Sequence, residues 1–248
     1  MSTSTPDALA GKTALLVGMG GLGCPAALCL VKAGVGHLLI ADDDPVDVTN
    51  LHRQILYDDS DVGRDKCEVA RARLTREARP GQRVESVTSR LLPDNARELV
   101  RRADVVLEGA DNFATKFLAS DACLLEGRPL VHGAAIRFRA TVWAVSPEGR
   151  PCYRCLFEDL PDDGAQPNCA EAGVMGPVVG LAGALMGDLA LSVLLGEPRY
   201  GELFTYDGRR DELRAVPVAE RPGCALCGQK PGIFEIRESR YIAPSCQA

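Results

Sequence analysis

The chain has 248 residues, of which 46% are hydrophobic and 25% are charged, as in ordinary globular proteins. Its net charge of −6 argues against a nucleic-acid-binding surface, and no apolar run is expected to be long enough to cross a bilayer. No secretory signal is recognisable among the first residues, which predicts a cytoplasmic protein without nucleic-acid or membrane partners.

The chain begins with the pattern of a parallel sheet. Apolar runs at residues 13–17 and 37–41 are typical of buried strands, and a helical segment at residues 25–33 lies between them and ends at Gly34. A strand, a glycine loop, a helix and a second strand in this order form the opening unit of a doubly wound sheet.

The rest of the chain predicts more strands and helices, first in a parallel and then in an antiparallel pattern. The expected helices lie at residues 66–79, 112–125 and 178–195, and the expected strands at residues 84–87, 104–107, 129–132, 139–145, 203–206 and 213–218. We therefore expect an α/β protein with a Rossmann-like doubly wound sheet and a single domain over residues 1–248. Residues 1–136 would form its nucleotide-binding half and residues 137–248 a second half.

A glycine-rich loop follows the first strand. Gly18, Gly20 and Gly23 match GxGxxG, in which the glycines allow a tight turn, close approach of a phosphate, and close packing of helix on strand. Asp42 ends the second strand, where a carboxylate can accept hydrogen bonds from ribose hydroxyls. The pattern predicts an adenosine nucleotide, either NAD or ATP. The alternative is a glycine turn that binds no ligand.

Charged residues after the ribose position favour ATP over NAD. Arg53 can bind phosphate oxygens through two donors, and Lys66 begins the next predicted helix. Asp111 follows another predicted strand, where a carboxylate can bind magnesium. Two cations and a carboxylate around a triphosphate suit nucleotidyl transfer. The alternative is that Arg53 and Lys66 are surface charges and Asp111 caps a helix.

Four of the ten cysteines form two CxxC pairs, Cys152/Cys155 and Cys224/Cys227. In a reducing compartment such pairs favour a metal over a disulfide, and four thiolates are typical of structural zinc. Two redox pairs or unpaired buried thiols are the alternatives. Cys169 lies alone in a long predicted loop, where a thiol becomes reactive if local charge lowers its pKa.

Short motifs span nearly the whole chain in a fixed order. Besides the loop Gly18-x-Gly-Gly-Leu-Gly23, they are Asp42-x-Asp44, Asn50-Leu-x-Arg-Gln54, Asp61-x-Gly-x-x-Lys66, Asp111-Asn-Phe113, Cys152-Tyr-Arg-Cys-Leu-Phe157, Cys169-x-x-x-Gly-Val174, Gly176-Pro-Val-Val-Gly180 and Cys224-x-x-Cys227. With them the chain resembles the ThiF/MoeB/HesA family, the bacterial relatives of ubiquitin-activating enzymes. The resemblance implies a homodimer that uses ATP and Mg²⁺ to adenylate the C-terminal Gly-Gly carboxylate of a ubiquitin-like sulfur-carrier protein, for thiamine, molybdopterin or related biosynthesis.

The resemblance also implies roles for individual residues. Asp42 would hold the ribose, Asp111 would hold magnesium, and the four cysteines of the CxxC pairs would hold one zinc ion. Cys169 would lie in a crossover loop near the adenylate and could form a covalent link to the carrier. The nucleotide site as a whole would comprise Gly18, Gly20, Gly21, Gly23, Asp42, Asp44, Asn50, Arg53, Gln54, Lys66, Asp111 and Asn112, with Arg53, Lys66, Asp111 and Cys169 as catalytic residues.

The chain departs from the family pattern in four places. No arginine precedes the glycine loop, although relatives carry one that reaches the partner's active site. Glu108 stands where aspartate is common, and Lys116 where arginine is common. The late apolar helix has Met186-Gly-Asp-Leu189 in place of a Gln-Ala-x-Glu motif. No rhodanese-like domain follows Cys227, so the sulfur donor would be a separate protein.

Three other functions compete with this one. The first 42 residues also fit a nicotinamide-dependent oxidoreductase. A zinc-stabilised scaffold could dock a ubiquitin-like partner without catalysis. An enzyme of the same superfamily could activate another carboxylate, such as a peptide terminus.

Overall fold

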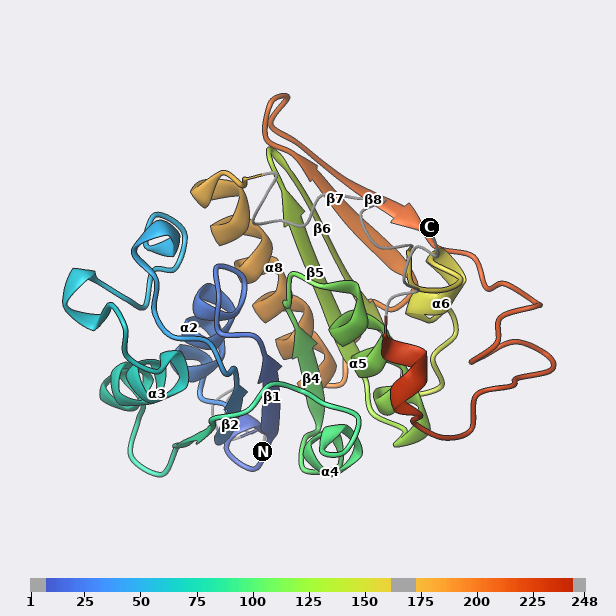
Figure 1. Ribbon diagram of the computed structural model, residues 1–248, viewed down its shortest axis with the longest axis horizontal. Helices are drawn as coiled ribbons and strands as arrows, with labels where there is room; N and C mark the ends of the chain where they lie inside the picture. Colours follow the sequence, from blue (N-terminus) through green and yellow to red (C-terminus); the bar gives the residue numbers. More distant parts are fainter. Residues whose placement is uncertain (1–7, 162–172, 243–248) are drawn as a thin grey trace.

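One mixed sheet of eight strands organises the computed structural model, in the order β3-β2-β1-β4-β5-β6-β7-β8 (Figure 1). The structure describes residues 8–161 and 173–242. The strands are β1 (Thr13–Val17), β2 (His37–Ala41), β3 (Arg83–Val87), β4 (Val105–Glu108), β5 (Leu130–Ile136), β6 (Arg139–Val145), β7 (Glu202–Asp207) and β8 (Glu212–Pro217).

The sheet changes from parallel to antiparallel along its width. β3, β2, β1, β4 and β5 run parallel, whereas β6, β7 and β8 follow as antiparallel neighbours. The change falls at the tight connection where Ile136 of β5 pairs with Arg139 of β6. This confirms the Rossmann-like sheet predicted from the sequence. The strand order reverses at β1 and β4, and such a switch point leaves a crevice at the carboxyl ends of the strands.

Helices cover both faces of the sheet. Leu16 of β1 and Leu38 of β2 pack into one core with α2 (Gly23–Ala33), α3 (Lys66–Glu77) and α8 (Gly176–Leu194). The alternate residues Leu15 and Leu39 face the opposite core, because successive side chains of a strand point to opposite faces. That second core is completed by α4 (Ala96–Arg101), α5 (Phe113–Leu125) and α6 (Tyr153–Leu156).

Helix α8 is the apolar segment that the sequence predicted as a buried helix. Contrary to the sequence expectation, its 19 residues are long and apolar enough to cross a membrane by length and composition, with half of its most apolar window buried. Its buried residues include Val178, Ala182 and Met186, and it packs against α2, β5 and β6. A buried core helix passes the same length and composition criteria, and these contacts place α8 in the core.

Short elements are the ones that the sequence did not predict. α4 is six residues long, and α6 is four residues long, so neither shows a helical period in the sequence. The 3₁₀ helices Val48–Asn50, Asp59–Asp61 and Glu238–Tyr241 were also not predicted. The longer predicted elements are present, with ends that differ by a few residues.

Candidate active site and metal centre

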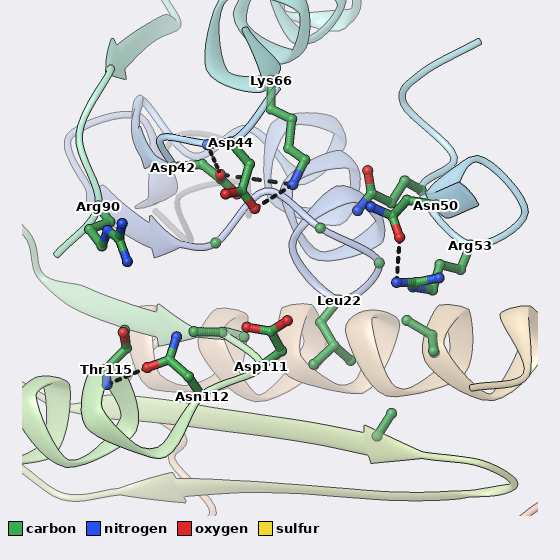
Figure 2. A pocket seen from close by; sticks show the side chains of 18 of the residues that line it. Leu22, Asp42, Asp44, Asn50, Arg53, Lys66, Arg90, Asp111, Asn112 and Thr115 are labelled. Atoms are coloured by element: carbon green, nitrogen blue, oxygen red, sulfur yellow. Dashed lines mark hydrogen bonds and ion pairs between the residues drawn. The ribbon is translucent and has the colours of Figure 1, made fainter. Parts of the chain in front are cut away.

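A pocket opens at the switch point, beside the carboxyl ends of β1, β2 and β4 (Figure 2). Its volume of ≈ 270 Å³ is near the lower end of the roughly 300–1,000 Å³ common for small-ligand sites. The predicted nucleotide residues that line it are Gly18, Gly20, Gly21, Asp42, Asp44, Asn50, Arg53, Gln54, Lys66, Asp111 and Asn112.

The glycine loop forms the floor of this pocket. Gly18 has φ of +90°, a conformation that favours glycine, and a side chain at Gly21 would collide with Val179. Gly23 does not line the pocket. It begins α2, and a Cβ there would overlap the carbonyl oxygen of Gly18, so it serves the close packing of helix on strand. No side chain of the described residues caps the N-terminus of α2, whose dipole favours an anion.

Asp42 is buried between the glycine loop and Lys66. Its Oδ2 accepts a hydrogen bond from the Met19 backbone N–H at 2.7 Å, and its Oδ1 accepts one from the Asp44 N–H at 2.9 Å. Burial raises the pKa of Asp42, and the Lys66 cation opposes this rise. Lys66 is itself 4% exposed, and its Nζ lies 2.8 Å from Asp44 Oδ2 and 4.0 Å from Asp42 Oδ1. The carboxylates thus hold the ammonium group at the pocket wall.

A second group of polar side chains comes from the segment after β2. Arg53 Nη2 donates to Asn50 Oδ1 at 2.5 Å, which fixes the guanidinium group beside the glycine loop (Figure 2). Gln54 is 4% exposed, and its Oε1 has no hydrogen-bond partner among the described residues. A buried polar atom without a partner is costly, so this amide is suited to a bound polar ligand.

Asp111 lies on the opposite wall, in the connection from β4 to α5. Asn112 caps α5, because its Oδ1 accepts a hydrogen bond from the Thr115 N–H at 2.9 Å. Asp111 is exposed and forms no hydrogen bond or ion pair within residues 8–161 and 173–242. The helix-cap alternative for Asp111 is therefore wrong, and its carboxylate is free to meet a ligand in the pocket.

Arg90 lines the pocket and was not predicted. It follows β3, and its Nε lies 2.9 Å from Asp43 Oδ2. Arg90 follows the strand predicted at residues 84–87, and the carboxyl ends of parallel strands meet at one edge of a doubly wound sheet, which was the signal that could have found it. Cys169 lies outside the described residues, so its predicted role stays a prediction.

The two CxxC pairs meet in one cluster, although 69 positions separate Cys155 from Cys224. The four Sγ atoms lie within 4.8 Å of one another. Cys152 Sγ is 3.5 Å from Cys224 Sγ, and Cys155 Sγ is 3.4 Å from Cys227 Sγ. Both contacts join one pair to the other, whereas a redox CxxC would bond within itself. Four sulfurs at the Zn–S distance of about 2.3 Å would lie about 3.8 Å apart, so the cluster fits a tetrahedral zinc ion.

The thiols of this cluster influence one another strongly. The hydrogen bond with Cys227 and burial raise the pKa of Cys152, whereas the same hydrogen bond lowers the pKa of Cys227 to about 5. One thiolate is therefore stabilised by its neighbours. A metal cation at the centre would stabilise the other three as well.

A buried ion pair fixes the segment around the cluster. Arg154, which lies between Cys152 and Cys155, donates to both oxygens of Asp121 of α5 at 2.8 and 3.0 Å. Tyr241 donates to Asp121 Oδ2 at 2.9 Å. Residues 218–242 contain no strand and only one short 3₁₀ helix, so these contacts and the cluster attach them to the sheet.

The fold and the pocket define a doubly wound α/β protein with a polar pocket at its switch point and a cluster of four thiols whose spacing suits a metal ion. A family model described as the ThiF family matches residues 3–226. The chain is 44% identical over 224 residues to the sulfur carrier protein adenylyltransferase of Thermus thermophilus, covering 88% of this chain and 82% of that protein. It is 41% identical over 230 residues to the SAMP-activating enzyme E1 of Haloferax volcanii, covering 92% and 84%. The chain belongs to the ThiF family.

Longer relatives and solved structures are also similar to this chain. The chain is 39% identical to the adenylyltransferase and sulfurtransferase MOCS3 of Drosophila sechellia, but it spans only 51% of that protein's length. The crystal structure of Escherichia coli MccB with ATP superposes with a TM-score of 0.76 at 21% identity, covering 90% of this chain and 68% of that one. At this identity the likeness shows a shared fold.

Proposed function

We propose that this protein adenylates the C-terminal Gly-Gly carboxylate of a ubiquitin-like sulfur-carrier protein, with ATP as the nucleotide donor. The observation that supports this most is the pocket at the switch point, where Asp42, Arg53, Lys66 and Asp111 come together. The names of the relatives from Thermus thermophilus and Haloferax volcanii support the same chemistry.

The proposed reaction needs no protein nucleophile. A carboxylate oxygen of the carrier attacks the α-phosphorus of ATP, a new P–O bond forms, and the bond to the β-phosphate breaks to release pyrophosphate. The difficulty is the concentration of negative charge, so positioning and charge stabilisation dominate. Arg53 and Lys66 face the phosphates in this proposal, and the glycine loop presents its backbone to them.

Lys66 must change partners when ATP binds. Its ammonium group contacts Asp44, whose side chain is 67% exposed, and the nearby Asp42 is held by two backbone N–H groups. We propose that Asp42 accepts from the ribose and that Lys66 turns from Asp44 to a phosphate oxygen. Asp111 would hold Mg²⁺, which supplies positive charge to the triphosphate when it is bound.

The remaining parts of the proposal concern the two halves of the chain and its partners. Residues 1–136 would bind the nucleotide, and residues 137–248 would bind the carrier. The second half would also hold the zinc ion through Cys152, Cys155, Cys224 and Cys227. The protein would act as a homodimer and receive sulfur from a separate donor. A nicotinamide oxidoreductase would leave Arg53 and Lys66 without a role, and membership of the ThiF family counts against it.

The direct test is ATP–pyrophosphate exchange with a carrier protein that ends in Gly-Gly. We expect exchange that depends on both the carrier and Mg²⁺, and none with a carrier that lacks its last glycine. Exchange that proceeds equally well without any carrier would contradict the proposal, as would tight binding of NAD in place of ATP.

Removing either cation of the pocket should slow the reaction. Arg53→Ala and Lys66→Ala should each lower carrier-dependent exchange by about 10²–10³-fold, or roughly 3–4 kcal/mol, by analogy with the loss of an oxyanion donor. Arg64→Ala is the matched control, because Arg64 lies between them in the sequence but pairs with Asp61 and does not line the pocket. Equal effects of all three changes would show that only the general surface charge matters.

Cys169 provides a separate test of the order of steps. Because adenylation requires no thiol, Cys169→Ala should keep exchange but lose any covalent adduct between enzyme and carrier and slow sulfur transfer. Mass spectrometry of the adduct and a sulfur-transfer assay measure this. Loss of exchange in a folded Cys169→Ala protein would place the thiol in the adenylation step, and unchanged sulfur transfer would remove it from the reaction.

A further inference from the structure

Three ionisable side chains meet in the core directly behind the wall that carries Asp111. Glu108 at the end of β4 is fully buried, with Lys116 of α5 and His132 of β5 around it. Lys116 Nζ lies 3.0 Å from Glu108 Oε2 and donates to the Gly133 carbonyl at 2.8 Å. His132 Nδ1 lies 3.0 Å from Glu108 Oε2. We refer to Glu108, Lys116 and His132 as the buried triad.

The buried triad bonds to the backbone that leads to Asp111. Glu108 Oε1 accepts a hydrogen bond of 2.6 Å from the Ala110 N–H, one residue before Asp111. The same connection packs closely on the glycine loop, since Gly109 and Ala110 backbone atoms lie 3.4 Å from where a Cβ of Gly18 would stand. The Glu108 carboxylate therefore fixes the path of the chain between β4 and the pocket wall.

Each member of the triad is held from a different element. β4 carries Glu108, α5 carries Lys116, and β5 carries His132, whose ring lies against Tyr153 with centroids 4.6 Å apart. Burial lowers the pKa of His132, which favours the neutral ring, and a proton on Nδ1 would let that ring donate to the Glu108 carboxylate. Its Nε2 has no partner among the described residues. Burial acts to raise the pKa of Glu108, but the Lys116 cation and the His132 hydrogen bond together outweigh it and lower this pKa, which favours the ionised carboxylate.

The stability of the fold does not explain why these three ionisable side chains are buried together. Burying a carboxylate and an ammonium group costs several kcal/mol per ion, and apolar residues of similar volume often replace a buried ion pair without loss. A hydrogen-bonded network has the advantage that it fixes one geometry. Groups that orient the ligands of a metal typically form networks of this kind.

We propose that the buried triad is a positioning device for the pocket, which holds the Gly109–Ala110 backbone so that Asp111 presents its carboxylate to the magnesium ion of bound nucleotide. The inference rests on the proposed function only in its assignment of Asp111 to magnesium. Glu108 is the central residue, because it alone contacts both the other members of the triad and the Ala110 N–H.

The length of the two charged side chains supplies the test. Glu108→Asp withdraws the carboxylate by one methylene, about 1.5 Å, so it cannot reach both Ala110 and Lys116. Lys116→Arg extends the cation and offers two donors to a carboxylate. The double variant Glu108→Asp/Lys116→Arg keeps both charges. Its longer cation compensates for the shorter carboxylate, so that the two side chains can again form an ion pair. Neither residue lines the pocket, so neither change removes a contact with the nucleotide.

The readout is the affinity for ATP, measured by calorimetry on the full-length protein with and without Mg²⁺. In Glu108→Asp we expect the affinity of the protein–ATP complex for Mg²⁺ to fall by about 10–100-fold, the usual effect of losing a group that orients a metal ligand. Binding of ATP without Mg²⁺ should change little, and the double variant should recover most of the Mg²⁺ affinity. His132→Phe, which keeps a ring against Tyr153 but removes the donor, should show a smaller loss of the same kind.

The control is Asp121→Asn. Asp121 lies on α5, is also fully buried and pairs with Arg154, but it does not line the pocket. This change should lower the melting temperature and leave the Mg²⁺ effect on ATP binding intact. The proposal is overturned if Glu108→Asp lowers stability as Asp121→Asn does but keeps the Mg²⁺ effect. If Glu108→Asp does not fold, His132→Phe decides the matter. A folded His132→Phe protein whose ATP complex binds Mg²⁺ with unchanged affinity would also overturn the proposal.

This assay contains no carrier protein, so it separates the inference from the proposed function. An unmodified protein that binds Mg²⁺ and ATP together but forms no carrier adenylate would contradict the proposed function, and the triad variants would still decide the inference. An unmodified protein whose ATP binding ignores Mg²⁺ would contradict the inference, whatever its activity.

Discussion

Replacing Asp111 with asparagine should abolish carrier-dependent ATP–pyrophosphate exchange while leaving the protein folded. The carboxylate is exposed on the pocket wall and is not engaged by any described residue, whereas its neighbour Asn112 caps α5. The change therefore removes a charge that faces the ligand and leaves the helix intact. Loss of metal-derived charge stabilisation is worth several kcal/mol, so exchange should fall by more than about 10³-fold.

The control for this prediction is Asp94→Asn. Asp94 is also exposed and lies just before a helix, α4, but it does not line the pocket. It should keep normal exchange, and both variants should melt at the temperature of the unmodified protein. Near-normal exchange in Asp111→Asn would exclude magnesium binding at this residue. A large fall in melting temperature would show instead that Asp111 supports the fold.

Replacing Cys224 with serine should remove the bound metal and destabilise the protein strongly. The purified protein should hold about one equivalent of zinc, since four thiolates fill one tetrahedral site. Structural zinc contributes an apparent 10–16 kcal/mol in small domains. If only about 4 kcal/mol is lost here, the melting temperature should fall by about 8–16 °C, because each kcal/mol is worth about 2–4 °C in a chain of this size.

The part of the protein that loses its stability when the metal is removed can also be predicted. Residues 218–242 contain no strand, and the cysteine cluster is one of their attachments to the rest of the protein, so limited proteolysis of the metal-free variant should cut there first. Cys29→Ser is the matched control, because Cys29 is a partly exposed thiol of α2 outside the cluster. It should retain the metal. A metal-free, fully stable unmodified protein would refute the assignment of a zinc site.

The sequence predicted the individual strands well because each strand depends on a local pattern. The strands are short apolar or alternating runs with glycine, proline or polar residues at their ends, and β1, β2 and β6 lie where they were expected. The small helices could not be predicted in the same way. α4 and α6 have too few residues to show a period, and tertiary packing on α5 stabilises them.

The site could be predicted only as far as single residues carry a signal. The glycine loop, Asp42 and the cysteine pairs stand out by type and spacing, and the structure brings them into a pocket and a cluster. The buried triad could not be found this way, because Glu108 and Lys116 look like conservative changes of surface charges. Their meeting with His132 depends on the register of β4 with β5, where Glu108 is paired with His132.

The two outermost strands, β3 and β8, each have a neighbour on one side only within the described part of the chain. Unpaired strand edges invite other chains to add to a sheet, and folded proteins resist this with charged residues and proline. β3 carries Arg83 and Glu85, while β8 carries Glu212 and Arg214 and ends at Pro217. These few side chains therefore protect the protein against aggregation. Replacing them with neutral residues would leave edge strands that can pair with those of other molecules and form insoluble assemblies.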